Sequence, residues 1–152
     1  MCYPDYLIRG IPNRDFLDED GLQSAKLFHF NKPESVRLPG YREESINWYD
    51  DEEAINHTFN QRKDDDSLQF KTGIAILARS ELDKVKNNPN VRERFNYERY
   101  RLPTNQYHGN ILLKTDAPKP LIRKIAAQLA LNVDRIITRE EYEIIVPVER
   151  TS

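Results

Sequence analysis

Two of the three histidines in this 152-residue chain, His29 and His108, fall at or in predicted strands. Two histidines can act as general acid and general base, as in metal-free cleavage of RNA. Lys71, or an arginine such as Arg9, would then stabilise the negative charge of the phosphorane. This hypothesis requires His29 and His108 to lie within about 6–8 Å of each other across a cleft. A half-buried histidine with ordinary hydrogen bonds explains each residue equally well.

A second candidate for chemistry or binding is the segment between positions 91 and 101, where arginines are interleaved with aromatic residues. Aromatic rings stack on the bases of single-stranded RNA, and arginines contact its phosphates. Two glutamates dilute this charge, and the sequence pI of about 6.0 is far below the value above 9 that is typical of a nucleic-acid-binding domain. Arginine and tyrosine are also enriched in the hot spots of protein interfaces. The candidate partner-binding residues are therefore Arg94, Tyr97, Arg99, Tyr100 and Arg101.

The common catalytic and cofactor motifs are missing from the chain. Its five glycines are isolated, so there is no Walker or Rossmann phosphate loop. The histidines are too scattered for a helical zinc pair, and no G-x-S-x-G motif is present. Acidic runs at 15–20, 49–53 and 64–66 are typical of solvated loops, with a cation site as the alternative. We therefore expect no metal and no cofactor.

The composition indicates a single soluble domain covering residues 1–152. The net charge is -2, 38% of the residues are hydrophobic and 32% are charged, which predicts a thin core. The longest apolar run, at 74–78, is far below the roughly 20 residues needed to span a bilayer. The first residues lack the basic and apolar regions of a secretory signal, so we expect a cytoplasmic protein without a membrane partner.

Apolar patterning and turn residues predict a mixture of strands and helices. Strands are expected at 6–11, 25–30, 45–49, 68–79, 108–114 and 142–148, with extended structure at 91–102. Helices are expected near 51–61, at 80–88 with a capping box formed by Ser80 and Asp83, and at about 117–131 with Asp116 as the capping side chain. The last helix carries an apolar stripe from Ile122 to Val133. This order predicts an α+β fold with a mostly antiparallel sheet and about three helices, the longest packed on one face.

Three functions remain open on this basis. The sequence favours a non-catalytic protein-interaction module, because the Arg/Tyr segment is visible while catalytic signatures are not. The first alternative is a metal-independent RNA-cleaving or other hydrolytic enzyme that uses the histidine pair. The second alternative is an RNA-binding module without catalysis.

Overall fold

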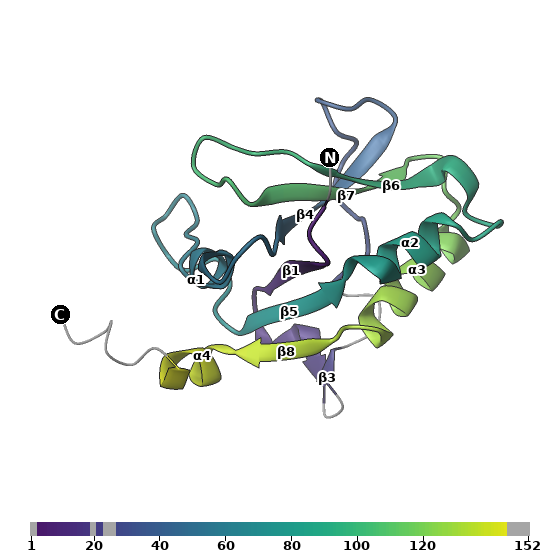
Figure 1. The fold of residues 1–152 in the computed structure, drawn as a ribbon. Coiled ribbons are helices and arrows are strands. Elements are labelled where there is room, and N and C mark those ends of the chain that lie inside the picture. The colour runs from purple at the N-terminus through teal and green to yellow at the C-terminus, as the bar shows by residue number, and fades with distance from the viewer. Residues whose placement is uncertain (1–2, 19–20, 23–26, 146–152) are drawn as a thin grey trace.

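The computed structural model describes residues 3–18, 21–22 and 27–145, and its main feature is a six-stranded antiparallel sheet (Figure 1). The strand order is β6-β7-β4-β1-β5-β8, and every pairing is antiparallel. The strands are β1 (Tyr6–Ile11), β4 (Tyr41–Trp48), β5 (Gly73–Ala78), β6 (Phe95–Arg99), β7 (His108–Lys114) and β8 (Arg135–Thr138). Two short strands, β2 (Leu17–Asp18) and β3 (Gly21–Leu22), pair separately. The predicted α+β class is confirmed.

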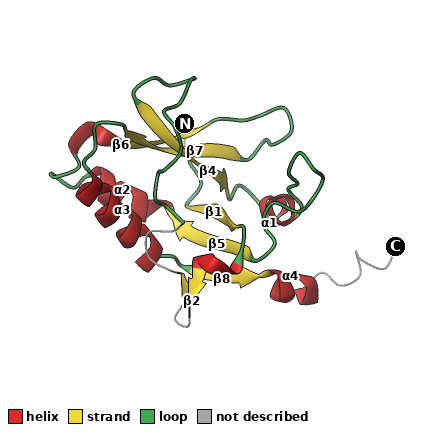
Figure 2. Cartoon of the chain, turned by 180° about the vertical axis from the view of Figure 1, so that it is seen from behind, coloured by secondary structure: helices red, strands yellow, loops and turns green. Residues whose placement is uncertain are grey.

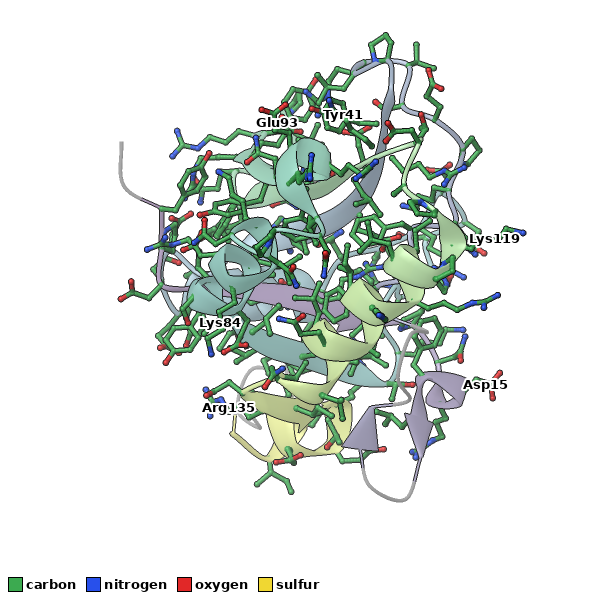
Figure 3. The ribbon with its side chains drawn as sticks, turned by 90° about the vertical axis from the view of Figure 1, so that its right-hand side faces the viewer. Asp15, Tyr41, Lys84, Glu93, Lys119 and Arg135 are labelled. Atoms are coloured by element: carbon green, nitrogen blue, oxygen red, sulfur yellow. The ribbon has the colours of Figure 1, made fainter. Side chains whose placement is uncertain are left out.

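Helices cover both faces of the sheet. The helices α2 (Arg79–Lys86) and α3 (Lys119–Leu131) lie on one face, which we call the α3 face. Figure 3 looks onto this face, where α3 crosses in front of the strands. The helices α1 (Glu53–Phe59) and α4 (Arg139–Ile145) lie on the opposite side, the α1 face (Figures 1 and 2). The longest helix therefore packs on one face, as predicted, and two short helices occupy the other.

Two hydrophobic clusters hold these layers together. The larger one joins the sheet to α2 and α3, and includes Leu7, Trp48 and Leu129. The smaller one joins β1, β5 and β8 to α1 and α4, and in it the rings of Phe59 and Tyr142 stack with their centroids 4.0 Å apart. Alternation along β1 explains the division, because successive side chains of a strand point to opposite faces.

Both predicted helix caps are wrong. The helix α2 begins at Arg79, so Ser80 lies inside it, and Asp83 accepts hydrogen bonds from Arg79 and Tyr97 instead of capping. The residue before α3 is Pro118, and no side chain caps this helix. Asp116 instead pairs with Arg94 at 3.3 Å. In each case the carboxylate contacts a residue of another segment: Asp83 accepts from the hydroxyl of Tyr97, and Asp116 pairs with Arg94.

Two predicted strands are also wrong within the described residues. Residues 142–145 of the expected strand 142–148 belong to α4, and 146–148 lie outside the described residues. Of the expected strand 25–30, residues 25–26 lie outside the described part, and 27–30 form no strand. Phe30 has a positive φ of 50°, which is incompatible with extended backbone, and its ring is buried in the larger cluster. Burial of aromatic side chains, not strand pairing, therefore explains the apolar character of 27–30.

The sheet opens between β1 and β4. The strand β1 pairs with β5 along all six of its residues, but it pairs with β4 only at Leu7 and Ile8. Beyond this point Arg9 reaches across the α3 face to Glu44 at 2.9 Å, and Glu44 is only 1% exposed. On the α1 face, the ring of Phe70 lies directly over Gly10. The gap between the two strands is thus closed by an ion pair on one face and an aromatic ring on the other.

Replacement of Gly10 by alanine tests this close approach. A Cβ at position 10 would lie 2.2 Å from Phe70 Cδ1, so Gly10→Ala is expected to lower the free energy of unfolding by about 1–3 kcal/mol. Urea denaturation of the single and double variants measures the effect. In a Phe70→Leu background the cost of Gly10→Ala should be smaller, and an unchanged cost would contradict the contact.

Candidate ligand-binding site

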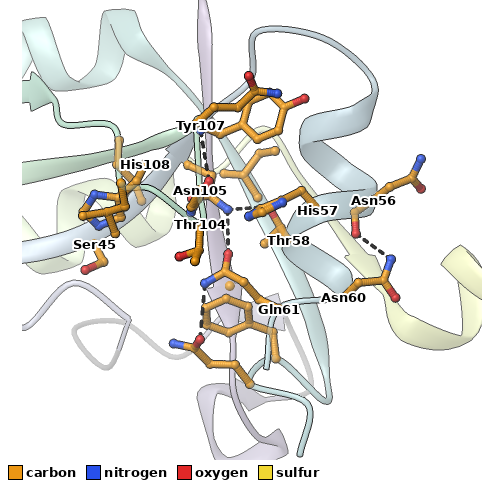
Figure 4. A pocket seen from close by; sticks show the side chains of 18 of the residues that line it. Ser45, Asn56, His57, Thr58, Asn60, Gln61, Thr104, Asn105, Tyr107 and His108 are labelled. Carbon is orange, nitrogen blue, oxygen red and sulfur yellow. Dashed lines mark hydrogen bonds between the residues drawn. The ribbon is translucent and has the colours of Figure 1, made fainter. Parts of the chain in front are cut away.

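A cavity of about 790 Å³ lies on the α1 face beside the opening between β1 and β4 (Figure 4). Its walls come from α1 and the segment that follows it, from β4, and from the loop that joins β6 to β7. Side-chain amides, hydroxyls and imidazoles dominate the lining. The residues used below are Asn47, His57, Thr58, Gln61, Gln69, Asn105, Tyr107 and His108.

A chain of amide hydrogen bonds crosses this cavity. Asn105 Nδ2 donates to Asn47 Oδ1 at 2.8 Å, and Asn47 Nδ2 donates to Gln61 Oε1 at 2.9 Å. Gln61 Nε2 then donates to Gln69 Oε1 at 3.2 Å. Asn47 and Asn105 are 4% and 6% exposed, so the first half of the chain is shielded from water. Four amides, from β4, the loop before β7 and the loop between α1 and β5, therefore form one continuous network.

Two flanking groups fix the direction of this chain. The backbone N–H of Tyr107 donates to Asn105 at 3.0 Å, so the atom that receives it must be the amide oxygen. The hydroxyl of Thr58 donates its single hydrogen to the carbonyl of Ala54 at 2.7 Å. Thr58 Oγ1 can then only accept from Asn47, at 2.7 Å, which requires the nitrogen of Asn47 at that position. All the amides consequently donate in the same direction, from Asn105 toward Gln69.

The amide network ends in a free donor group at Gln69. Gln69 accepts through Oε1, and its Nε2 donates no hydrogen bond to any residue in the described part of the chain. Hydrogen bonds that run in one direction polarise one another, which strengthens the last donor. The Gln69 side-chain NH₂ is thus prepared to bind an acceptor atom of a ligand.

Two histidines line the same cavity. His108 Nδ1 lies 2.8 Å from the carbonyl oxygen of Tyr100, which can only accept, so Nδ1 carries the proton and Nε2 of the neutral ring is an acceptor. His57 lies on α1 with its ring centroid 5.5 Å from that of Tyr107. Its Nε2 is buried without a hydrogen-bond partner among the described residues. Burial lowers the pKa of His57, which favours the neutral imidazole.

The expected pair of His29 and His108 is not assembled. His29 lines a cavity of about 330 Å³ on the α3 face, together with Ile122 and Arg123 of α3. His108 lies on the α1 face, so the sheet separates the two imidazoles. The histidine that shares a cavity with His108 is His57. Arg9 and Lys71 do lie together, in a further cavity that neither histidine lines.

The predicted partner-binding residues are divided between interior and surface. Tyr97 packs against Trp48, and its hydroxyl donates to Asp83 at 2.6 Å. Arg99 forms two hydrogen bonds with Asp50, at 2.8 and 2.5 Å. Arg94 pairs with Asp116, as described above, while Tyr100 is 38% exposed and Arg101 is exposed.

The amide network was not predicted from the sequence. Its members come from β4, the segment after α1 and the loop before β7, so no local spacing connects them. The only signal was a local excess of amides, with Asn56, Asn60 and Gln61 in one segment and Asn105 and Gln106 in another.

Within 3–18, 21–22 and 27–145, no group of three or more His, Cys, Asp or Glu residues is arranged to hold a metal ion. No helix among these residues is long and apolar enough to cross a membrane. No protein-family model matches the chain, and neither a curated protein nor a solved structure matches it.

Replacement of Asn47 by aspartate tests the role of the amide at the centre of the network. A carboxylate keeps the shape but cannot donate to Thr58 or Gln61, and it would be buried beside their oxygens. We expect Asn47→Asp to lower the free energy of unfolding at pH 7 by about 3 kcal/mol or more. Chemical denaturation measures this loss. The matched control is Asn96→Asp at the exposed position of β6, expected to change stability by less than about 0.5 kcal/mol. Equal effects in the two variants would contradict the network.

The half-buried imidazole of His57 predicts a pH dependence of stability. Its pKa is lowered in the folded protein, so the unfolded chain binds more protons once the pH falls below the unfolded value of about 6.5. The contribution of the neutral ring to the free energy of unfolding is therefore fully present above this pH. It is lost as the pH falls through the lowered pKa of His57 in the folded protein. Denaturation between pH 5 and pH 8 should show a smaller acid-side loss for His57→Gln than for the wild type. Identical pH profiles would refute this role of His57.

Proposed function

We propose that this protein binds a small polar ligand in the cavity of the α1 face. The observation that carries the proposal is the one-directional amide chain, which ends on the free NH₂ of Gln69. The other three amides of the network each donate to a neighbouring amide, and the oxygens of all four accept hydrogen bonds. The unused donor of Gln69 is positioned by the hydrogen bond that its Oε1 accepts from Gln61, as is typical of a preorganised binding site.

The cavity supports a ligand with an uncharged polar body. Its volume of about 790 Å³ lies within the range of roughly 300–1,000 Å³ found for small-molecule sites. Amides offer both donors and acceptors, and the rings of His57 and Tyr107 provide flat apolar surface. Sugars and heterocyclic bases have this combination of groups.

Binding of a small ligand has more support than the functions considered from the sequence. A protein-binding role for residues 94–101 would use Tyr97 and Arg99, but both are engaged in intramolecular contacts. Turnover was attributed to His29 and His108, which lie on opposite faces. RNA binding would use the same segment, so the intramolecular contacts of Tyr97 and Arg99 count against it as well.

Titration of the ¹⁵N-labelled protein with uridine and with glucose, both at millimolar concentration, tests the proposal. We expect one of the two to shift the amide resonances of residues that line the cavity. Gln69→Met keeps the length of the side chain but removes the terminal donor, so the affinity should fall about tenfold, the effect of roughly 1.4 kcal/mol from one hydrogen bond.

The matched control is Gln128→Met on α3, outside the cavity. This variant should bind like the wild type. Absence of any shift in the cavity with both compounds, or equal affinity of Gln69→Met and the wild type, would overturn the proposed function.

A further inference from the structure

A second cavity, of about 400 Å³, adjoins the first and is markedly basic. Gln69 and Phe70 line both cavities, so these two residues form a shared wall. The cationic residues of the second cavity come from three separate segments of the chain. They are Arg9, Lys32, Lys63 and Lys71.

The three lysines are not neutralised by ion pairs. None of them takes part in a salt bridge with a carboxylate of the described residues. Like charges that share one cavity repel each other, and this repulsion favours binding of a counter-charge. The nearby carboxyl group of Asp65 has a lowered pKa, mainly because it accepts hydrogen bonds from Ser67. The positive charges of Lys63 and Lys71 lower this pKa further.

Arg9 adds a fixed charge to this set. Its Nη2 is held by Glu44 at 2.9 Å, and its Nε donates to the carbonyl of Leu27 at 3.3 Å. The remaining terminal nitrogen, Nη1, has no hydrogen-bond partner among the described residues. The Arg9 side chain is only 14% exposed. Two nitrogens of its guanidinium therefore hold it in place through Glu44 and Leu27, while Nη1 is left without a partner among the described residues.

We propose that the ligand is a phosphate monoester, with its phosphate between the basic residues and Gln69 and its uncharged body in the larger cavity. This inference rests on the proposed function, because it extends the same site across the shared wall. A phosphate monoester carries about -1.5 to -2 charges and three acceptor oxygens at pH 7. Three ammonium groups, one guanidinium nitrogen and one polarised amide supply more charge and more donors than a single carboxylate would use.

Calorimetry on the full chain with matched compounds tests this inference. Uridine is compared with uridine 5′-monophosphate, glucose with glucose 6-phosphate, and inorganic phosphate is measured alone. The nucleotide and sugar pairs distinguish the two sources of a phosphate monoester. We expect the phosphorylated member of one pair to bind at least tenfold more tightly than its parent. Because exposed lysines are screened by ions, this advantage should shrink with added salt.

Variants locate the phosphate. Lys63→Gln combined with Lys71→Gln should remove most of the advantage of the phosphorylated compound and leave affinity for the unphosphorylated parent unchanged. The matched control combines Lys114→Gln with Lys124→Gln, which removes the same charge away from both cavities. A loss of the same size in the control would show that net charge alone is responsible, and it would overturn the inference.

The outcomes separate this inference from the proposed function. Equal affinity for both members of each pair would overturn the phosphate site and leave the cavity as a site for the uncharged body. Lysine-dependent binding of inorganic phosphate as tight as that of both phosphorylated compounds would overturn the proposed function, because the body would then add nothing. Tighter binding of one phosphorylated compound than of either its parent or phosphate supports both.

Discussion

The side-chain amide of Asn47 is the interaction on which the site depends. This residue lies in the middle of the sheet on β4, and its three hydrogen bonds reach the helix α1, the segment after it and the loop before β7. An uncompensated amide at a position that is 4% exposed would cost about 1–3 kcal/mol. The three segments are therefore held in the one arrangement that satisfies Asn47, and this arrangement encloses the cavity.

The backbone of the sheet provides the space for this network. Because β1 leaves β4 after Ile8, the strand has neighbours on only one side along its second half. Phe70 fills the α1 face of the gap by lying on Gly10, and Arg9 with Glu44 fills the α3 face. Gly10 and Phe70 line the larger cavity, and Phe70 and Arg9 line the smaller one, so the irregularity of the sheet also creates the candidate site.

Local patterns predicted most of the sheet and the longest helix. The strands at 6–11 and 108–114 and the apolar stripe from Ile122 to Val133 follow from alternation and helical periodicity, which depend only on neighbours in the chain. Ile125 and Leu129 of this stripe are buried. The strand β8 and helix α4 were missed because Arg135–Ile145 has a weak pattern, and its fold depends on pairing with β5 and on stacking of Tyr142 against Phe59. The amide chain was beyond prediction for the same reason, since Asn47, Gln61 and Asn105 meet only in the folded sheet.

The exchange of side-chain amide hydrogens with deuterium, followed by NMR in the free protein, tests most directly whether the network has this direction. The amide hydrogens of Asn47 are both donated and buried, so they should exchange slowly. Those of Gln69 Nε2, the free end of the chain, should exchange as fast as those of an exposed amide. Protection at Gln69 together with faster exchange at Asn105, the opposite end of the network, would show that the network runs the other way, and it would contradict the account.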